Sequence, residues 1–579
     1  MSLDGARLAI LASRLDAITR RMTVTLLRSA RSTIINAARD FSCCLLTADG
    51  RLLAVGESLP IHVLAGTDEV ARGLLELDEP VARGDAFLHN SPYHGNSHAA
   101  DHCILVPVFD DAGSHQFTVL VKAHQADCGN SQPTTYFAGA RDVYEEGALI
   151  FPWVRVQHEY RMREDVLRMC AMRIRVPEQW HGDFTAALGT ARIGERLVAE
   201  LAADVGWDEL SKLADGIVAH GRRSMRAAIA ALPAGSASIR TRHDAIPELP
   251  EGIELNVGVE LLPQEGRVVV DLRDNPDCVP CGLNLTAATA RAAATLGVFN
   301  GLGAEVAPNA GSLACVEVLL RRGCVVGIPE HPTSCSVATS NLTQRVASAV
   351  SCAMADLADG IGLAEAGTGL PPAVAVASGT SPEGTPFVNQ LSLALTGGPA
   401  APHADGWLTL AGVETAGMCR LDSVEVDELR YPLRVDQQRL IPDSGGAGRT
   451  RGAAAARVEL GPVGCDVELA WTSDGTDAPA RGARGGAPGS RARQVVVDAT
   501  GAERPAGISG VFAIRDGERV LADSCGGGGY GDPGERAREE VRRDVAEGLV
   551  SAAAAVEAYG LEAVSAPAGL AVAARPFGP

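Results

Sequence analysis

The spacing of hydrophobic positions changes several times along the chain, and each change predicts a different kind of element. Apolar residues recur at helical spacing in five stretches, which predict helices at 6–38, 183–203, 207–232, 287–302 and 341–358. Alternating apolar and polar residues predict β-rich segments at 238–273 and 425–522. Shorter strands are predicted at 41–46, 51–54, 314–320 and 324–328, and a helix pair at 534–559.

This order of elements predicts a multi-domain α+β protein. A chain of 579 residues exceeds the length at which a single hydrophobic core stops growing. We expect an N-terminal mixed α/β domain at 1–235, a central α/β domain at 236–420 and a C-terminal β-rich domain at 421–579 that ends in the helix pair. The turn-forming residues after Pro233 mark the first of these boundaries.

Two short apolar runs predict a β-hairpin with unusual polar residues at its open end. The runs 103–109 and 116–123 are rich in β-branched and aromatic residues, and the turn formers DDAGSH separate them. Pairing Phe109 with Gln116 sets Asp101 opposite His124, with Cβ atoms roughly 5 Å apart. Lys122 shares their face, and a slip of one residue would separate Asp101 from His124.

The open end of this hairpin is a candidate metal site. Asp127 follows His124 by three residues, so two carboxylates and one imidazole can gather there. Such donors suit Zn²⁺, Mn²⁺ or Fe²⁺. The alternative is that Asp101 begins a strand and that His124 is an ordinary hydrogen-bonded histidine at the end of a sheet.

Charge and composition exclude several classes of function. The formal net charge of −20 argues against non-specific binding to nucleic acid or to an anionic membrane. The first residues, MSLDGARLAI, lack the pattern of a signal peptide, and no apolar stretch reaches the length of a membrane span, so we expect a cytoplasmic protein. In that compartment the 14 cysteines are expected to be free thiols, and the CxxC at Cys278 and Cys281 has no second pair to complete a zinc knuckle.

Several common catalytic motifs are missing from the sequence. It contains no phosphate-binding P-loop, no GxSxG nucleophile turn and no HExxH metalloprotease helix. Glycine clusters at 444–452 and 525–534 can either cradle an anion on backbone N–H groups or form close-packed backbone, and we favour close packing.

A series of short motifs, in order along nearly the whole chain, resembles the hydantoinase B/oxoprolinase family. They include ARDFSCCLLTADGRLLA (38–54), ESLPIHVLAG (57–66), NSPYHGNSHAAD (90–101), AHQADCG (123–129), YEEG (144–147), DSGGAGRTRG (443–452) and GGGGYGDP (526–533). The family includes subunits of ATP-dependent hydantoinases, caprolactamases and 5-oxoprolinases, and of acetone and acetophenone carboxylases.

The resemblance implies a divalent metal, Zn²⁺, Mn²⁺ or Fe²⁺, in this subunit. The family's metal-binding positions fall on Asp40, Asp101, His124 and Asp127. His98 matches a family histidine and is implied as a ligand or a general acid/base. Glu146, in the YEEG element, is a second acid/base candidate, although it can equally be a solvated loop carboxylate.

The resemblance also implies partners. An A-type subunit would bind ATP and phosphorylate the substrate in a hetero-oligomer, so ATP would act only through that partner. The first hypothesis is the hydrolytic subunit of an ATP-dependent cyclic-amide hydrolase. A ketone carboxylase subunit and a non-catalytic assembly subunit are the alternatives. Ser91 and Gln125 replace an Asp and a His of the family pattern, and Asn96 and Ser97 are further departures. These departures bear on the substrate more than on the metal site.

Overall fold

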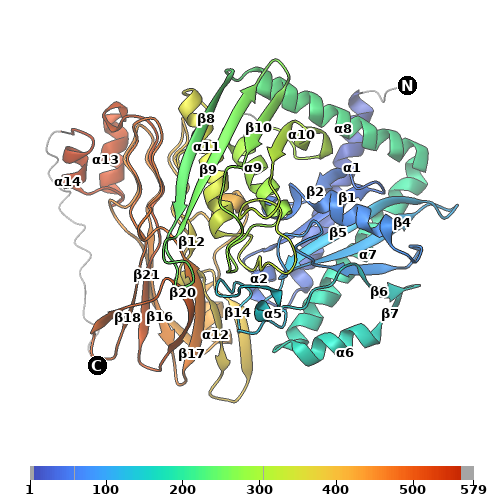
Figure 1. Ribbon diagram of the computed structural model, residues 1–579, viewed down its shortest axis with the longest axis horizontal. Coiled ribbons are helices and arrows are strands. Elements are labelled where there is room, and N and C mark those ends of the chain that lie inside the picture. Colours follow the sequence, from blue (N-terminus) through green and yellow to red (C-terminus); the bar gives the residue numbers. More distant parts are fainter. Residues whose placement is uncertain (1–4, 58, 304, 562–579) are drawn as a thin grey trace.

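The computed structural model describes residues 5–57, 59–303 and 305–561 of the chain. It has the expected mixed α/β, multi-domain architecture. In Figure 1 the N-terminal elements lie on the right, the C-terminal sheets on the left, and the central sheet between them at the top. In the described part of the chain, none of the helices combines the length and apolar character needed to cross a bilayer.

A seven-stranded sheet, ordered β2-β1-β5-β4-β3-β6-β7, forms the N-terminal part. Its strands are β1 (Phe41–Thr47), β2 (Leu52–Val55), β3 (Ala86–His89), β4 (Asp101–Phe109), β5 (His115–His124), β6 (Val154–His158) and β7 (Arg161–Met162). Long helices cover one face, and shorter ones fill the connections. These helices are α1 (Gly5–Ser29), α2 (Thr33–Asn36), α3 (Pro60–Val63), α4 (Thr67–Arg72), α5 (Val143–Glu146), α6 (Glu164–Arg173), α7 (Pro177–Val205) and α8 (Trp207–Ala230).

The predicted register of the hairpin is confirmed. Asp101 pairs with His124, and the same pairing continues to Val108 opposite Phe117. The expected pairing of Phe109 with Gln116 is wrong, because a bulge after Val108 sets Phe109 opposite His115. A bulge next to the turn leaves the pairing at the other end unchanged. The face with Val106 and Val119 packs under the helices, as alternation predicts, and the opposite face is buried as well.

The central part is a four-stranded sheet ordered β11-β10-β9-β8, with two helices packed on it. Its elements are β8 (Gly235–His243), β9 (Ile253–Leu262), β10 (Arg267–Asp271), α9 (Ala287–Gly301), α10 (Ala310–Leu313), β11 (Val316–Leu319) and α11 (Asn341–Leu357). The strand predicted at 324–328 is wrong, because only isolated bridges form there. Cys278 and Cys281 are free thiols, and burial raises their pKa to about 11 and about 12.

The C-terminal part contains two five-stranded sheets and ends in the predicted helix pair. The first sheet joins β12 (Gly369–Leu370), β13 (Val376–Thr380), β14 (Pro386–Gln390), β17 (Val467–Ser473) and β20 (Ser509–Ile514). The second joins β15 (Leu433–Leu440), β16 (Ala456–Pro462), β18 (Arg493–Val497), β19 (Glu503–Pro505) and β21 (Arg519–Asp523). The helices are α12 (Val424–Arg430), α13 (Arg538–Ala546) and α14 (Ala552–Glu557). The third hydrophobic core already begins at Ala373, before the expected boundary at 420/421.

Four successive glycines, 526–529, lie among segments that approach too closely for any side chain. A Cβ at each glycine would overlap a different backbone carbonyl, those of Ser444, Gly398, Arg481 and Ala447. Their N–H groups donate to four further carbonyls, those of Ser490, Ala453, Glu365 and Ala487. The glycine clusters are therefore close-packed backbone.

Gly527→Ala is expected to destabilise the protein by about 3 kcal/mol or more, because the added methyl group must push apart the segment at Gly398. Gly189→Ala is the matched control. Gly189 lies exposed within α7, with nothing within 4 Å of an added Cβ. That control should stabilise the helix by up to about 1 kcal/mol. Chemical denaturation of both variants measures the difference, and equal stabilities would contradict the packing assignment.

A buried ion pair joins the central part to the C-terminal sheets. Arg345 of α11 donates through Nε to Asp474 Oδ2 at 2.8 Å, and Asp474 Oδ1 accepts from the backbone N–H of Asp244. Burial alone would raise the pKa of Asp474, but Arg345 and His243 hold it well below its usual range. The lowered pKa means that the carboxylate stabilises the folded state above about pH 4, the ordinary pKa of an aspartic acid.

Asp474→Asn should lower the free energy of unfolding at neutral pH by about 3–5 kcal/mol, because it removes the nearer carboxylate from the buried Arg345 and leaves only Glu365 at 3.9 Å. The difference in free energy of unfolding between the variant and the unmodified protein should shrink as the pH falls below about 4, because protonation of Asp474 removes its charge interaction with Arg345. Thermal denaturation of both proteins across that pH range tests whether the stability difference shrinks as the pH falls. Asp359→Asn, which removes an exposed pair with Arg449, should have little effect at any pH.

Candidate metal centre

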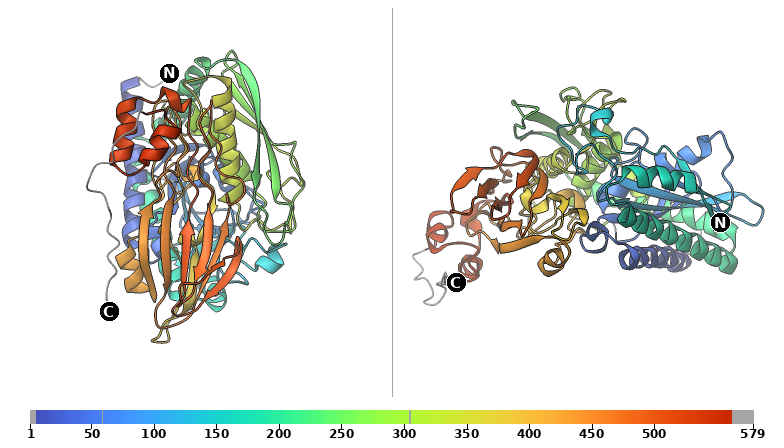
Figure 2. Two further views of the ribbon diagram at one scale, coloured as in Figure 1. Left: turned by 90° about the vertical axis from the view of Figure 1, so that its left-hand side faces the viewer. Right: turned by 90° about the horizontal axis from the view of Figure 1, so that it is seen from below.

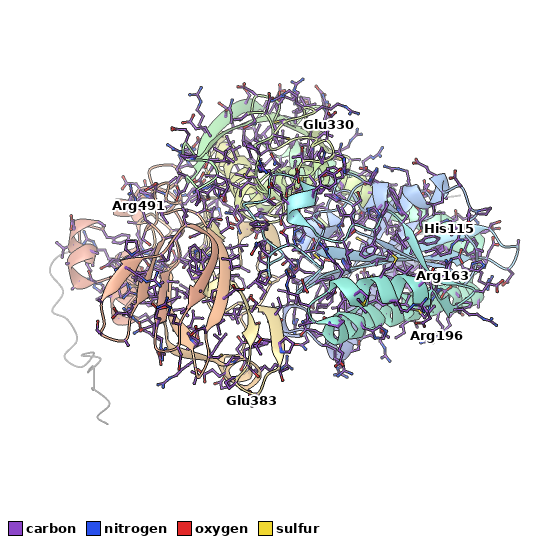
Figure 3. The ribbon with its side chains drawn as sticks, turned by 60° about the horizontal axis from the view of Figure 1, so that its bottom comes forward. His115, Arg163, Arg196, Glu330, Glu383 and Arg491 are labelled. Atoms are coloured by element: carbon purple, nitrogen blue, oxygen red, sulfur yellow. The ribbon has the colours of Figure 1, made fainter. Side chains whose placement is uncertain are left out.

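The open end of the β4–β5 hairpin brings three donor atoms together inside the protein. His98 Nε2 lies 3.1 Å from Asp101 Oδ1, His124 Nδ1 lies 3.0 Å from the same oxygen, and the two nitrogens are 3.2 Å apart. All three residues are buried. Figure 3 labels His115, which marks the opposite, peripheral end of β5. Other labelled charged residues, such as Arg196, also lie at the periphery.

The loop before β4 holds His98 in place through its own side chains. Asn96 Nδ2 donates to the backbone carbonyls of Asn90, His98 and Asp101. The Ser97 hydroxyl donates to Asp101 Oδ2. Two residues that depart from the family pattern therefore shape the loop and hold the carboxylate.

The outer hydrogen bonds of the two imidazoles decide which nitrogen faces the centre. His98 Nδ1 lies 2.9 Å from the Ser336 carbonyl, which can only accept, so Nδ1 carries the proton. The Nε2 lone pair of the neutral ring then points at Asp101. His124 Nε2 lies 3.1 Å from Thr135 Oγ1 and leaves Nδ1 facing the centre. The Tyr136 ring stacks on His124 and fixes the plane of that imidazole.

A second histidine and a second aspartate border the three donors. His62 Nε2 lies 3.3 Å from Asp101 Oδ2 and 3.4 Å from Asp40 Oδ1, while His62 Nδ1 lies 3.3 Å from Ser42 Oγ. His62 is not among the predicted site residues, although it lies in the ESLPIHVLAG motif. Its place in that motif, two residues after Pro60 in the short helix α3, was the only local signal for it.

The centre concentrates lone pairs and negative charge. Burial alone would raise the pKa of Asp101, but the His98 and His62 imidazoles hold it well below its usual range. Burial alone would lower the pKa of His98, but Asp101 raises it. Burial raises the pKa of Asp40. These directions mean that the arrangement favours a positive charge between the rings and Asp101.

The donor set fits a transition-metal cation. Ligands about 2.1 Å from such an ion lie about 3.0–3.4 Å apart when their bonds make angles between 90° and tetrahedral. His98, Asp101 and His124 already have separations of 3.0–3.2 Å. These three residues form the only group of three or more His, Cys, Asp or Glu donors compact enough for an ion within the described residues.

Two of the predicted ligands, Asp40 and Asp127, lie outside the compact donor group, and hydrogen bonds hold Asp127 elsewhere. Its Oδ2 accepts from the backbone N–H of Arg175 at 2.5 Å, and its Oδ1 accepts from the Arg175 guanidinium at 3.0 Å. Oδ1 also accepts from the Gly129 N–H. Both oxygens are therefore occupied in the loop after β5, and Asp127 is not part of the compact donor group.

Glu146 and two positions that depart from the family pattern, Gln125 and Ser91, contact residues other than the three donors. Glu146 is buried, accepts from the Ser334 hydroxyl at 2.8 Å, and has its pKa raised by burial. It is therefore not a solvated loop carboxylate. Gln125 donates to the Ala123 carbonyl, and Ser91 lies 2.8 Å from His94 Nδ1. These two departures from the family pattern bond outside the donor group.

Comparison with known proteins supports the sequence motifs. The hydantoinase B/oxoprolinase family model matches residues 4–533. The chain is 28% identical to the caprolactamase subunit beta of Pseudomonas jessenii, over 97% of this chain and 96% of that protein. It is 25% identical to the acetophenone carboxylase delta subunit of Aromatoleum aromaticum, over 92% of this chain and 82% of that protein.

Solved structures share the fold. The crystal structure of the ATP-dependent caprolactamase from Pseudomonas jessenii matches with a TM-score of 0.86 and 28% identity, over 97% of this chain and 96% of that one. A nucleotide-free acetone carboxylase structure matches with a TM-score of 0.83 over 96% of this chain and 79% of that one. Its 19% identity to this chain supports a common fold and no more.

Metal analysis of single variants tests the donor set. Asp101→Asn and His124→Gln should each weaken the binding of Zn²⁺ or Mn²⁺ by about 100-fold or more, because each removes a donor from the compact group. Asp127→Asn should keep its metal, because that carboxylate is held by Arg175. Circular dichroism verifies that each variant is folded. Loss of metal from Asp127→Asn together with retention in Asp101→Asn would refute this assignment.

Proposed function

Because the chain belongs to the hydantoinase B/oxoprolinase family, we propose that it is the metal-bearing hydrolytic subunit of an ATP-dependent cyclic-amide hydrolase. One structural observation carries this proposal: Asp101 and His124 of the donor group line a buried cavity, together with Asp40 and His62. A substrate bound there would have its carbonyl group beside the donor set.

The donor residues suit the chemistry of amide hydrolysis. A divalent cation held by His98, Asp101 and His124 would polarise a carbonyl oxygen and activate a water molecule. An amide resists hydrolysis because its nitrogen lone pair is delocalised into the carbonyl group. Phosphorylation of the carbonyl oxygen removes that resistance, which accounts for the use of ATP.

Proton transfer is assigned to Asp40 rather than to Glu146. Asp40 lines the cavity, and burial raises the pKa of its carboxyl group, so it can hold and release a proton beside the substrate. Glu146 faces Ser334 and does not line that cavity. We assign Glu146 to the support of the segment with Ser334 and Ser336, whose Ser336 carbonyl accepts from His98.

An A-type partner would supply the ATP site. The sequence contains no P-loop, and the structurally similar caprolactamase is ATP-dependent. The relatives named as subunits also support a hetero-oligomer. In this division of labour the partner activates the substrate and the present chain hydrolyses it.

A ketone carboxylase subunit is the second candidate. Similarity to the acetophenone carboxylase delta subunit over 92% of this chain supports it. Hydrolysis is preferred because the match to the caprolactamase subunit is more complete in both chains and is higher in identity. The two functions differ in their need for bicarbonate.

Co-expression with an A-type partner, followed by ATP-turnover assays, separates the two candidates. We expect cyclic amides to stimulate ATP hydrolysis and to be converted to ring-opened amino acids without added bicarbonate. Asp101→Asn in the same complex should abolish product formation, because the donor group is broken. ATP turnover that requires both a ketone and bicarbonate would instead establish the carboxylase function.

A further inference from the structure

The cavity beside the donor group is small and has walls from all three parts of the chain. Its volume is about 50 Å³, which holds only one or two water molecules. An engineered protein cavity that accepts benzene measures about 150 Å³, so these walls must separate when a ring enters. Its apolar lining consists of Ile34, Leu59, Ile61, Leu370, Val374, Leu395, Ala411 and Cys419.

Two polar side chains in the wall have oxygens without a partner. Gln390 Oε1 and Glu414 Oε2 are buried and accept no hydrogen bond from any described residue. The two residues are only 5% and 4% exposed. A buried acceptor without a donor costs about 1–3 kcal/mol, so each such group indicates a missing partner.

A chain of hydrogen bonds fixes the orientation of Glu414. Gly369 N–H donates to Gln344 Oε1 at 2.6 Å, and Gln344 Nε2 donates to Glu414 Oε1 at 2.8 Å. This arrangement occupies one carboxyl oxygen and leaves Oε2 available. Burial raises the pKa of Glu414 to about 8, so at neutral pH the group is a neutral acid that can donate or accept.

The charges of the wall exclude one kind of ligand. No Lys or Arg occurs among the described residues that line the cavity, whereas Asp101, Asp40 and the neutral Glu414 do. The cation held by the donor group would face the amide carbonyl, so a carboxylate elsewhere on the ring would be buried without a counter-charge, which is strongly unfavourable. The lining therefore suits an uncharged ring.

We propose that Gln390 and Glu414 determine substrate specificity and select small uncharged cyclic amides over carboxylate-bearing ones. The ring N–H donates to Gln390 Oε1, Glu414 Oε2 makes the second polar contact, and the ring methylenes pack on the apolar wall. This inference rests on the proposed function, because it identifies the cavity as the substrate site.

Calorimetry on the full chain, with Mn²⁺ or Zn²⁺ present, compares three probes. They are δ-valerolactam, its N-methyl derivative and L-5-oxoproline. The lactam should bind at least about tenfold more tightly than the N-methyl compound, which has no N–H to donate. It should also bind more tightly than 5-oxoproline, which brings an unpaired carboxylate.

A pair of glutamine variants assigns this selectivity to the wall. Gln390→Leu should weaken lactam binding about tenfold and leave the N-methyl compound unaffected, so that the difference between the two ligands disappears. Gln494→Leu is the matched control. Gln494 is also buried with an unpartnered Oε1, but it lies on β18 and does not line the cavity. It should keep the full difference between the ligands.

Glu414→Leu should also weaken lactam binding, whereas Glu414→Gln, which is polar and uncharged, should retain most of the affinity for the lactam. Equal binding of the three probes, including no binding of any, would overturn the proposal, as would a preference for 5-oxoproline. The metal content of the same samples, and the ATP turnover of the complex with the A-type partner, test the proposed function separately. A chain with metal and lactam-dependent turnover but the wrong ligand preference would refute only the roles of Gln390 and Glu414.

Discussion

The register between β4 and β5 is the constraint on which the candidate site depends. Because side chains alternate between the faces of a sheet, a shift of one residue would send Asp101 and His124 to opposite sides. Apolar residues on both faces resist such a shift, since each would lose its buried neighbours. The bulge at Phe109 takes up the irregularity of the turn, so the pairing at the open end is preserved. The position of the donors is therefore set by residues that take no part in the chemistry.

The sequence predicted this part of the site because the information is local. Alternation within one hairpin is enough to pair Asp101 with His124. It is not enough for contacts made between distant segments. Arg175 occupies both oxygens of Asp127 from 48 residues away, and His62 meets Asp101 only because α3 lies beside the strand ends. Spacing along the chain contains neither fact, so the prediction grouped Asp127 with Asp101 and His124 and did not include His62.

The C-terminal part shows the same limit on a larger scale. Close packing could be predicted from the glycine clusters, but not which segments approach one another. In the structure Gly527 packs against Gly398, and the segment that contains Gly398 continues from the cavity wall at Gln390. Because the glycines have no side chains, the C-terminal segments can approach closely enough to complete the walls of the cavity. The metal donors that line the same cavity lie more than 250 residues earlier in the chain than Gln390. The C-terminal part thus supplies the surroundings of the donors rather than the donors themselves.

The orientation of the donors also depends on more than the N-terminal sheet. The Ser336 carbonyl, 238 residues after His98, accepts from Nδ1 and so directs the Nε2 lone pair of the neutral ring toward Asp101 and His124. A single proton could bridge only two of the three facing atoms, His98 Nε2, Asp101 Oδ1 and His124 Nδ1, whereas a divalent cation can attract all three. Ser336 lies just before α11, the helix that also binds Asp474 through Arg345. The packing of α11 therefore influences both the junction with the C-terminal sheets and the nitrogen that His98 presents, so the orientation of the donors depends on how the central part packs against the N-terminal sheet.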